Sequence, residues 1–245
     1  MNVMSDNWLE RTELLLGMQR LKQQETSHIL IVGLGGVGAY TAEMLCRAGI
    51  GNLTIIDADI ICPSNINRQL PALHSTIGQS KVALLEARLK DINPKVNIVA
   101  LQEFLKDERI IELLENNKYD FIVDAIDSIS PKVFLIYHAL TRKIPIISAM
   151  GAGGKMDISK IKITDISKTY QCALAKVVRK RLKSLGIFKG LPVVFSTEPV
   201  NKNAIILLES EQNKKSSAGT ISYLPAVFGC YLAQYVITNL GINKF

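Results

Sequence analysis

Residues 28–40 read HILIVGLGGVGAY, and this stretch decides the fold class. Its first half is a run of apolar residues, typical of a strand buried on both faces of a parallel sheet. Its second half has glycines at positions 33, 35 and 38, the G-x-G-x-x-G spacing that joins such a strand to a helix in nucleotide-binding domains. Gly33 permits a tight turn, Gly35 lets a phosphate approach the backbone, and Gly38 lets the helix pack on the strand. The stretch predicts a nucleotide site, and NAD and ATP fit it equally well.

Apolar segments and helical segments alternate from this stretch as far as residue 150, the pattern of a parallel sheet with helices on both faces. The expected strands lie within residues 28–33, 52–57, 95–101, 119–127 and 144–150. We predict a Rossmann-like, doubly wound α/β fold with a mostly parallel sheet and a C-terminal α+β elaboration. The chain is expected to form one domain (1–245), made of an N-terminal helical segment (1–27), a nucleotide-binding core (28–150) and an elaboration on the substrate side (151–245).

The composition narrows the class of protein. With 245 residues and 48% hydrophobic content, the chain is long enough for one large domain with an extensive core. No apolar run approaches the roughly 18 residues of a membrane span, and the N-terminus lacks the basic-then-apolar order of a secretory signal. The four cysteines form no C-x-x-C pair and the three histidines are scattered, so no zinc site is predicted. We therefore expect a cytoplasmic protein without a membrane span, with reduced cysteines.

The net charge of +7 is concentrated in one segment of the chain. No acidic residue lies between Asp165 and Glu198, whereas seven basic residues do: Lys168, Lys176, Arg179, Lys180, Arg181, Lys183 and Lys189. Five of the seven fall on a helix predicted near residues 172–185 and are candidates for binding a nucleic-acid backbone: Lys176, Arg179, Lys180, Arg181 and Lys183. A solvated helix face would have the same composition, and this alternative stays open.

The residues that follow the second predicted strand favour ATP over NAD. Asp57 ends this strand and suits the ribose hydroxyls of either nucleotide. Asn65, Arg68 and Lys81 come next along the chain, and a cluster of Arg and Lys suits a triphosphate better than a diphosphate. An NAD-dependent oxidoreductase, the alternative from another class, would have no use for this cluster.

Two carboxylates end the fourth predicted strand, within residues 123–128, VDAIDS. Asp124 and Asp127 are candidates for holding Mg²⁺ over the phosphates, because carboxylate oxygen is the usual protein ligand of that ion. The carboxyl ends of parallel strands meet at one edge of the sheet, so these residues are expected near the glycine turn. The sequence thus predicts a site for ATP with Mg²⁺.

Short motifs occur in an order that resembles a known family: RTELLLG (11–17), GLGGVG (33–38), IID (55–57), SNINRQL (64–70), IGQSK (77–81), INP (92–94) and DAIDS (124–128). The order is similar to that of the ThiF family, the adenylating enzymes related to the activators of ubiquitin and of sulfur-carrier proteins. DAIDSISPK (124–132), GAGGKMDISKIKITDISKT (151–169) and VVFSTE (193–198) resemble one branch, the tRNA threonylcarbamoyladenosine dehydratases. This branch uses ATP to close the side chain of the modified adenosine at position 37 of certain tRNAs into a ring.

The resemblance implies a role for each candidate residue. Nucleotide contacts would come from Gly33, Gly35, Gly36, Gly38, Asp57, Asn65, Arg68, Lys81 and Asp127, with Mg²⁺ placed by Asp127. The catalytic set would be Arg68, Lys81 and Asp127, joined by Arg11 from the other subunit of a homodimer. With RNA as the substrate, the five basic residues near 172–185 become candidates for tRNA binding. A sulfur-transfer protein is a further possible partner.

Two other functions stay open at this point. The nearer one is an adenylyltransferase that activates the C-terminus of a ubiquitin-like or sulfur-carrier protein, although the two C-x-x-C pairs common in the sulfur-carrier activators are absent here. The other is an RNA-binding module without catalytic activity.

The chain also departs from the family pattern, because Cys172 and Ala173 stand where relatives usually have Asp-Pro. A thioester or sulfur-relay role for Cys172 is the alternative to an inert thiol, and the inert thiol is favoured.

Overall fold

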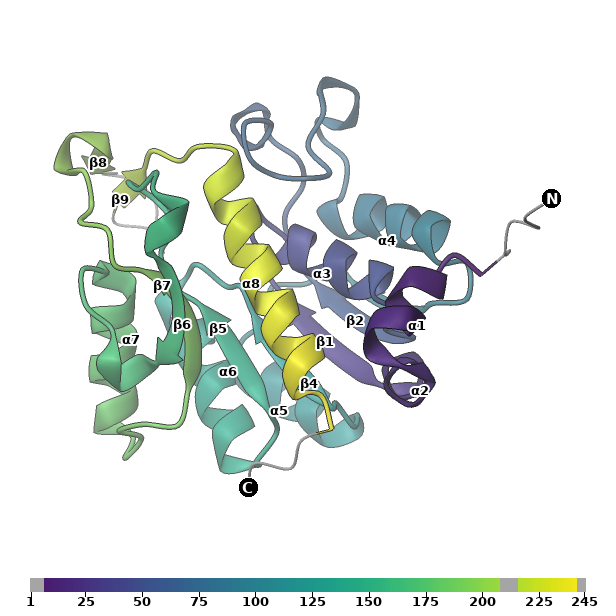
Figure 1. Cartoon of the computed structure of the whole chain (residues 1–245). Coiled ribbons are helices and arrows are strands. Elements are labelled where there is room, and N and C mark those ends of the chain that lie inside the picture. The colour runs from purple at the N-terminus through teal and green to yellow at the C-terminus, as the bar shows by residue number, and fades with distance from the viewer. Residues whose placement is uncertain (1–6, 208–215, 242–245) are drawn as a thin grey trace.

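The computed structural model describes residues 7–207 and 216–241. Seven strands form one sheet in the order β3-β2-β1-β4-β5-β7-β6 (Figure 1). Their bounds are β1 (His28–Val32), β2 (Asn52–Ile56), β3 (Asn97–Leu101), β4 (Phe121–Asp124), β5 (Ile146–Ala149), β6 (Ile161–Asp165) and β7 (Pro192–Ser196). All neighbours pair in parallel except β6, which is antiparallel to β7. The predicted α/β fold is confirmed, and each of the five predicted segments contains one strand.

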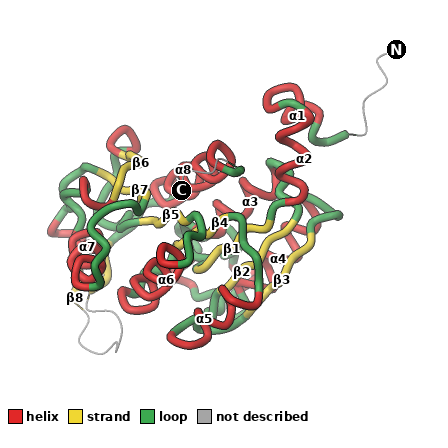
Figure 2. The backbone as a smooth tube through the Cα atoms, turned by 90° about the horizontal axis from the view of Figure 1, so that it is seen from below, coloured by secondary structure: helices red, strands yellow, loops and turns green. Residues whose placement is uncertain are grey.

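Six of the eight α-helices in the described ranges cover the two faces of this sheet, and α1 and α2 project from one end (Figure 2). The bounds of the eight are α1 (Glu10–Leu16), α2 (Met18–Thr26), α3 (Gly38–Arg47), α4 (Lys81–Ile92), α5 (Asp107–Asn116), α6 (Ile129–Thr141), α7 (Ala173–Ser184) and α8 (Tyr223–Asn239). Successive residues of β1 point to opposite faces, so Ile29 and Ile31 pack with α3, α4 and α8, whereas Leu30 and Val32 pack with α5, α6 and α7. Two buried cores therefore sandwich the sheet.

The strand order reverses between β1 and β4. The chain runs outward from β1 through β2 to β3, then returns to β4 on the other side of β1. In open α/β sheets a ligand binds at the carboxyl ends of the strands where the order reverses. The glycine turn begins at the carboxyl end of β1, and the long connection between β2 and α4 rises above the same edge of the sheet (Figure 1). Both predicted parts of the nucleotide site thus meet at one place.

The C-terminal third contributes to the main sheet and adds a small second one. β6 and β7 extend the sheet beyond β5, while β8 (Ile205–Leu207) and β9 (Ser216–Ala218) form a separate antiparallel pair. α8 returns across the sheet and packs against α3. The predicted division of the domain into 1–27, 28–150 and 151–245 stays a prediction. None of the helices within residues 7–207 and 216–241 is long and apolar enough to span a membrane.

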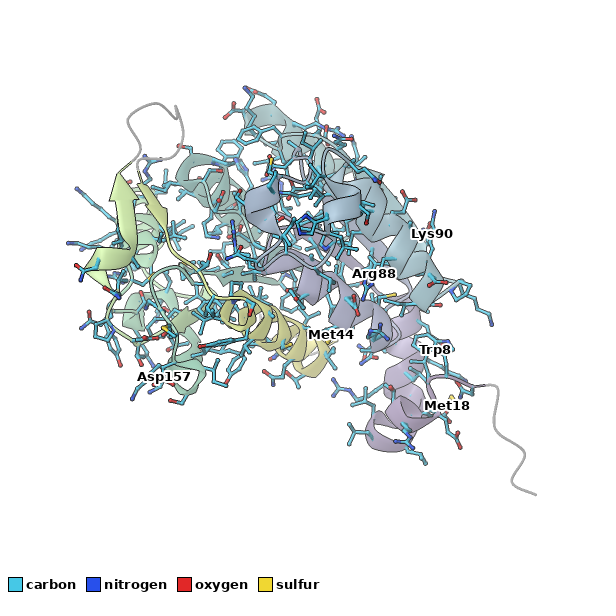
Figure 3. All side chains as sticks on the ribbon, turned by 90° about the horizontal axis from the view of Figure 1, so that it is seen from above. Trp8, Met18, Met44, Arg88, Lys90 and Asp157 are labelled. Atoms are coloured by element: carbon cyan, nitrogen blue, oxygen red, sulfur yellow. The ribbon has the colours of Figure 1, made fainter. Side chains whose placement is uncertain are left out.

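The N-terminal helices expose apolar side chains. α1 has no buried residue, and the side chains of Leu14 and Leu15 are 81% and 83% exposed. Trp8 and Met18 are also exposed, and Figure 3 shows both at the end of the molecule that α1 and α2 occupy. Exposed apolar patches of this kind mark interaction surfaces.

Candidate active site

A cavity of about 500 Å³ lies at the carboxyl ends of β1, β2, β4 and β5. Small-molecule and cofactor sites have this size. Among the residues predicted for nucleotide binding or catalysis, those that line the cavity are Gly33, Gly35, Gly36, Asp57, Asn65, Arg68, Lys81 and Asp127. Gly38, Arg11 and the five basic residues of α7 do not line it. The structure thus brings together most of the predicted nucleotide site from four separate stretches of the chain.

The glycine turn is shaped by close contact with the loop after β4. Gly33 has φ +90°, and a Cβ built there would lie 2.7 Å from the carbonyl oxygen of Ala125. A Cβ on Gly38 would overlap the carbonyl oxygen of Gly33, so this position supports the turn from beneath rather than facing the cavity. A Cβ built on Gly36 would lie 3.2 Å from the carbonyl oxygen of Arg68. Side chains at these positions would displace the turn or the residues around it.

Asp57 connects the glycine turn to the residues after β2. Its carboxylate accepts hydrogen bonds from the backbone N–H groups of Leu34 at 2.6 Å and Asp59 at 2.8 Å. Burial raises the pKa of Asp57, and the nearby Lys81 and these two hydrogen bonds oppose that rise. A carboxylate fixed in this way beside a glycine turn can receive ribose hydroxyls.

Arg68 and Lys81 are both held at the cavity wall. The Lys81 side chain is only 4% exposed, and its ammonium pairs with Oδ2 of Asp59 at 2.7 Å. Nη1 of Arg68 donates to the carbonyl of Ser64 and to Oδ1 of Asn67, each at 2.8 Å. These contacts orient the two cations in advance of any ligand. Two fixed positive charges beside a glycine turn form an anion site that suits a polyphosphate.

Asp124 is not available as a magnesium ligand. Its side chain is fully buried and forms an ion pair with the equally buried Lys132 at 2.8 Å, while the Ser148 hydroxyl donates to it at 2.5 Å. The prediction that Asp124 holds Mg²⁺ is therefore wrong, because its carboxylate does not line the cavity and is already bound by Lys132 and Ser148. Asp127, which is exposed and lines the cavity, remains the candidate.

The carboxylates suit a nucleotide-bound ion better than an ion held by protein alone. Within the described part of the chain, no group of three or more His, Cys, Asp or Glu side chains could enclose a metal. Mg²⁺ commonly takes one or two protein carboxylates and completes its shell with phosphate oxygens and water. Asp127 lines the cavity and stays the predicted carboxylate for such an ion, whereas Asp59 is paired with Lys81.

Some lining residues were not assigned from the sequence. Gln69 is 8% exposed and its Oε1 has no hydrogen-bond partner, so this amide is poised for a ligand or a small rearrangement. Phe104, after β3, lines the cavity with its side chain 53% exposed. Leu174 extends the wall from the first turn of α7. An exposed aromatic in the polar segment QEFLKD was the available signal for Phe104.

The basic residues of α7 divide into two groups. Arg179 is partly buried, and its Nη1 donates to the carbonyl and the hydroxyl of Thr169, at 2.9 and 2.5 Å. Arg181 donates to the Ser130 hydroxyl on α6 at 3.0 Å. The other three are exposed on one face of the helix, at spacings of four and three residues: Lys176, Lys180 and Lys183. Arg181 is exposed as well, so RNA binding by the five residues stays a prediction, and these three lysines form the stripe without a hydrogen bond of the kind that ties Arg179 and Arg181.

Cys172 lies close to the cavity and is nearly buried. It is 9% exposed, and a Cβ built on the cavity residue Gly151 would lie 3.5 Å from its Sγ. No histidine or acid lies on its own segment, residues 166–197. The inert thiol favoured from the sequence stays a prediction.

Comparison with known proteins agrees with this geometry. The chain matches the ThiF family over residues 9–243. It is 37% identical over 241 residues to the tRNA threonylcarbamoyladenosine dehydratase of Bacillus subtilis, covering 94% of this chain and 93% of that protein. The Escherichia coli K12 protein of the same name is 39% identical over 258 residues, covering 97% and 96%. A molybdopterin-synthase adenylyltransferase of Haemophilus influenzae is 30% identical over 168 residues, covering 69% and 67%.

Solved structures give the same result. The E. coli tRNA N6-threonylcarbamoyladenosine dehydratase in complex with AMP superposes with a TM-score of 0.85 at 34% identity, covering 98% of this chain and 97% of that one. Its complex with ATP also has a TM-score of 0.85 at 34% identity, covering 97% and 96%. The match along nearly the whole chain, together with the glycine turn and the two cations at one cavity, shows that this protein belongs to the ThiF family.

Proposed function

We propose that this protein is an ATP-dependent tRNA threonylcarbamoyladenosine dehydratase that activates the substrate carboxylate by adenylation. The observation that carries the proposal is the convergence of the glycine turn, Asp57, Arg68 and Lys81 on one cavity, in a chain alike along nearly its full length to dehydratases solved with ATP and AMP. The reaction closes the threonylcarbamoyl side chain of the modified adenosine into a ring, with loss of one water. A tRNA substrate is consistent with the predicted cytoplasmic location, which stays a prediction.

The chemistry requires activation because a carboxylate would have to expel oxide. Attack of a carboxylate oxygen on the α-phosphorus of ATP forms an acyl adenylate and releases pyrophosphate. A group of the same nucleoside then attacks the acyl carbon and expels AMP, so the oxygen of the lost water leaves in AMP. Because this second step is intramolecular, a fixed geometry supplies much of the rate.

The protein would contribute positive charge where pyrophosphate departs. Arg68 and Lys81, already oriented at the cavity wall, would stabilise the charge that builds on the β- and γ-phosphates. Asn65 would add a polar contact, although its Oδ1 also accepts from the backbone of Cys62 at 3.1 Å. Asp127 would hold Mg²⁺, which would supply further charge neutralisation at the phosphates when bound.

The direct test is mass analysis of nucleosides from modified tRNA incubated with the enzyme, ATP and Mg²⁺. The proposal predicts that the threonylcarbamoyladenosine peak loses the mass of one water, only when ATP is present. An unchanged nucleoside would contradict it. Pyrophosphate exchange driven by a protein C-terminus instead of by modified tRNA would favour the carrier-protein adenylyltransferase, which the partial likeness to a molybdopterin-synthase adenylyltransferase keeps as the second candidate.

The exposed stripe Lys176, Lys180 and Lys183 would bind the tRNA backbone. Changing all three to glutamine is expected to reduce the slope of log affinity against log salt by about 2 to 3, because each lost phosphate contact removes about 0.7–0.9 from the slope. ATP affinity should not change, since none of the three lines the cavity. Titrating tRNA at several salt concentrations measures this. As a control, Arg181→Gln alone should change the slope by clearly less than the about 0.7 of one phosphate contact, because Arg181 is tied to Ser130.

The exposed apolar surface of α1 supports a homodimer in which Arg11 reaches the partner's site. Arg11 is exposed on α1 and does not line the cavity of its own chain. If Arg11 acts across the interface, Arg11→Ala and Arg68→Ala subunits, each inactive alone, form mixed dimers with one intact site. Mixing equal amounts should restore about a quarter of the parent turnover, since half of the dimers are mixed and one of two sites works. No recovery after subunit exchange would contradict the role of Arg11.

The sulfur-transfer partner stays a prediction.

A further inference from the structure

A buried ion pair lies directly beneath the cavity and belongs to no assigned function. Asp124 ends β4, Lys132 lies on α6, and both side chains are 0% exposed. Neither residue lines the cavity. A buried ion pair is weak evidence for stability, because apolar residues of similar size often stabilise a core as well or better. A buried ion pair can, however, orient its neighbours, because each charged group forms directional hydrogen bonds with the polar groups around it.

The pair binds Ile126 on both sides of its Cα, through the N–H of the peptide group before it and the C=O of the peptide group after it. Oδ1 of Asp124 accepts a hydrogen bond from the backbone N–H of Ile126 at 3.1 Å. Nζ of Lys132 donates to the carbonyl oxygen of the same Ile126 at 2.8 Å, and to Oδ2 of Asp124 at 2.8 Å. The hydroxyl of Ser148 on β5 fixes that second oxygen. With its N–H and its C=O both bound, Ile126 has little freedom to rotate.

The clamped segment supports two parts of the nucleotide site. Asp127, the proposed magnesium residue, is attached directly to Ile126. On the other side, the carbonyl of Ala125 lies against Gly33, where a built Cβ would come within 2.7 Å, and the Ala125 methyl lies 3.2 Å from a built Cβ of Gly38. A rotation of the Ala125–Ile126 peptide would therefore move Asp127 and the glycine turn together.

The geometry points to the Lys132–Asp124 pair as a positioning device that sets Asp127 and the glycine turn for adenylation. This inference rests on the proposed function of the cavity. An apolar pair could fill the same volume, but it could not bind the N–H and C=O of Ile126. Supporting residues of this kind matter because a displacement of about 1 Å at reacting groups can cost roughly 10²-fold in rate.

The test is the double variant Asp124→Leu/Lys132→Met, which leaves neither charge buried alone. Measured well below its melting temperature and at saturating tRNA, it should lose about tenfold to a hundredfold in kcat and raise the KM for ATP. Its tRNA affinity should stay unchanged. Ser148→Ala, which removes only the hydroxyl that fixes Asp124, should give a smaller loss of the same kind and serves if the double variant fails to fold.

The control is Glu43→Gln, which removes the charge of another buried carboxylate, here one paired with two half-exposed arginines. Glu43 is 5% exposed and pairs with Arg88 at 2.6 Å and Arg47 at 2.8 Å, and none of the three lines the cavity. This variant should melt at a lower temperature and keep the parent kcat and KM. A merely structural role for Lys132 and Asp124 would give the same result for them.

The outcomes separate this inference from the proposed function. A parent protein that neither binds ATP in calorimetry nor removes water from the nucleoside would overturn the proposed function and the inference with it. A parent that does both, while the double variant and Ser148→Ala keep kcat and KM within about twofold of it, would overturn the inference alone. A loss in both variants with an unaffected Glu43→Gln supports it.

Discussion

Replacing Arg68 by alanine is expected to lower kcat by about 10²- to 10³-fold, the usual cost of removing one preorganised donor from a developing negative charge. Arg68 lines the cavity, and its guanidinium is oriented by Ser64 and Asn67 before any nucleotide binds. The charge it meets is greatest as pyrophosphate leaves, so the loss should fall on kcat more than on KM for ATP. Affinity for tRNA should be nearly unchanged. Steady-state kinetics of pyrophosphate release, with tRNA affinity in parallel, measure both.

The control for Arg68→Ala is Arg142→Ala. Arg142 also has a paired guanidinium, at 2.7 Å from Glu115, but it lies outside the cavity lining. This variant should keep the parent kcat. Arg68→Lys should recover only part of the lost rate, because an ammonium cannot reproduce the fork of guanidinium donors. Normal turnover in Arg68→Ala would remove Arg68 from the catalytic set.

Replacing Lys81 by methionine is expected to lower kcat/KM for ATP by about 10²-fold. The change keeps the length of the side chain, which is 96% buried, and removes its charge. It leaves Asp59 without its partner, but that side chain is 68% exposed, so water can solvate the carboxylate and the fold should persist. Calorimetric titration with ATP and initial rates of AMP formation measure the effect.

Lys90→Met is the matched control for Lys81→Met. Lys90 lies on the same helix and pairs with Glu86 at 2.6 Å, outside the cavity. Its loss should leave ATP binding and turnover as in the parent. An equal effect of both substitutions, or none at Lys81, would show that the Lys81 ammonium does not act on the phosphates.

The sequence was most informative where a pattern is local. Apolar runs predicted β1 to β5; β1, β2, β4 and β5 are buried on both faces and need continuous apolar residues, whereas β3 lies at the edge of the sheet and is partly exposed. Most of the residues predicted from the glycine spacing and from the segment after β2 line the cavity, since carboxyl ends of parallel strands meet at one edge. The addition of β6 antiparallel to β7 was not predictable in the same way, because that pairing joins Ile161 to Ser196 across a whole helix.

The wrong assignment of Asp124 and the residues that the sequence left unassigned have physical causes as well. Asp124 and Asp127 look alike in the sequence, and only the packing of α6 places Lys132 against the first of them. Arg179 was grouped with its basic neighbours, although helical periodicity puts it beside the buried Ala175, Val178 and Leu182. A closer reading of that periodicity would have separated it from the exposed lysines. Gln69 lies inside the motif SNINRQL and Phe104 is an aromatic residue in a polar segment, but neither signal indicates that the side chain lines the cavity.

The central claim is that the cations after β2 steady a departing pyrophosphate while the substrate carboxylate is joined to AMP. The most direct measurement uses modified tRNA whose threonyl carboxylate carries ¹⁸O, incubated with the enzyme, ATP and Mg²⁺, followed by mass analysis of the nucleotide products. The account predicts AMP that has gained a labelled oxygen, together with unlabelled pyrophosphate. Label in inorganic phosphate formed with ADP, or unlabelled AMP beside the cyclised nucleoside, would contradict it.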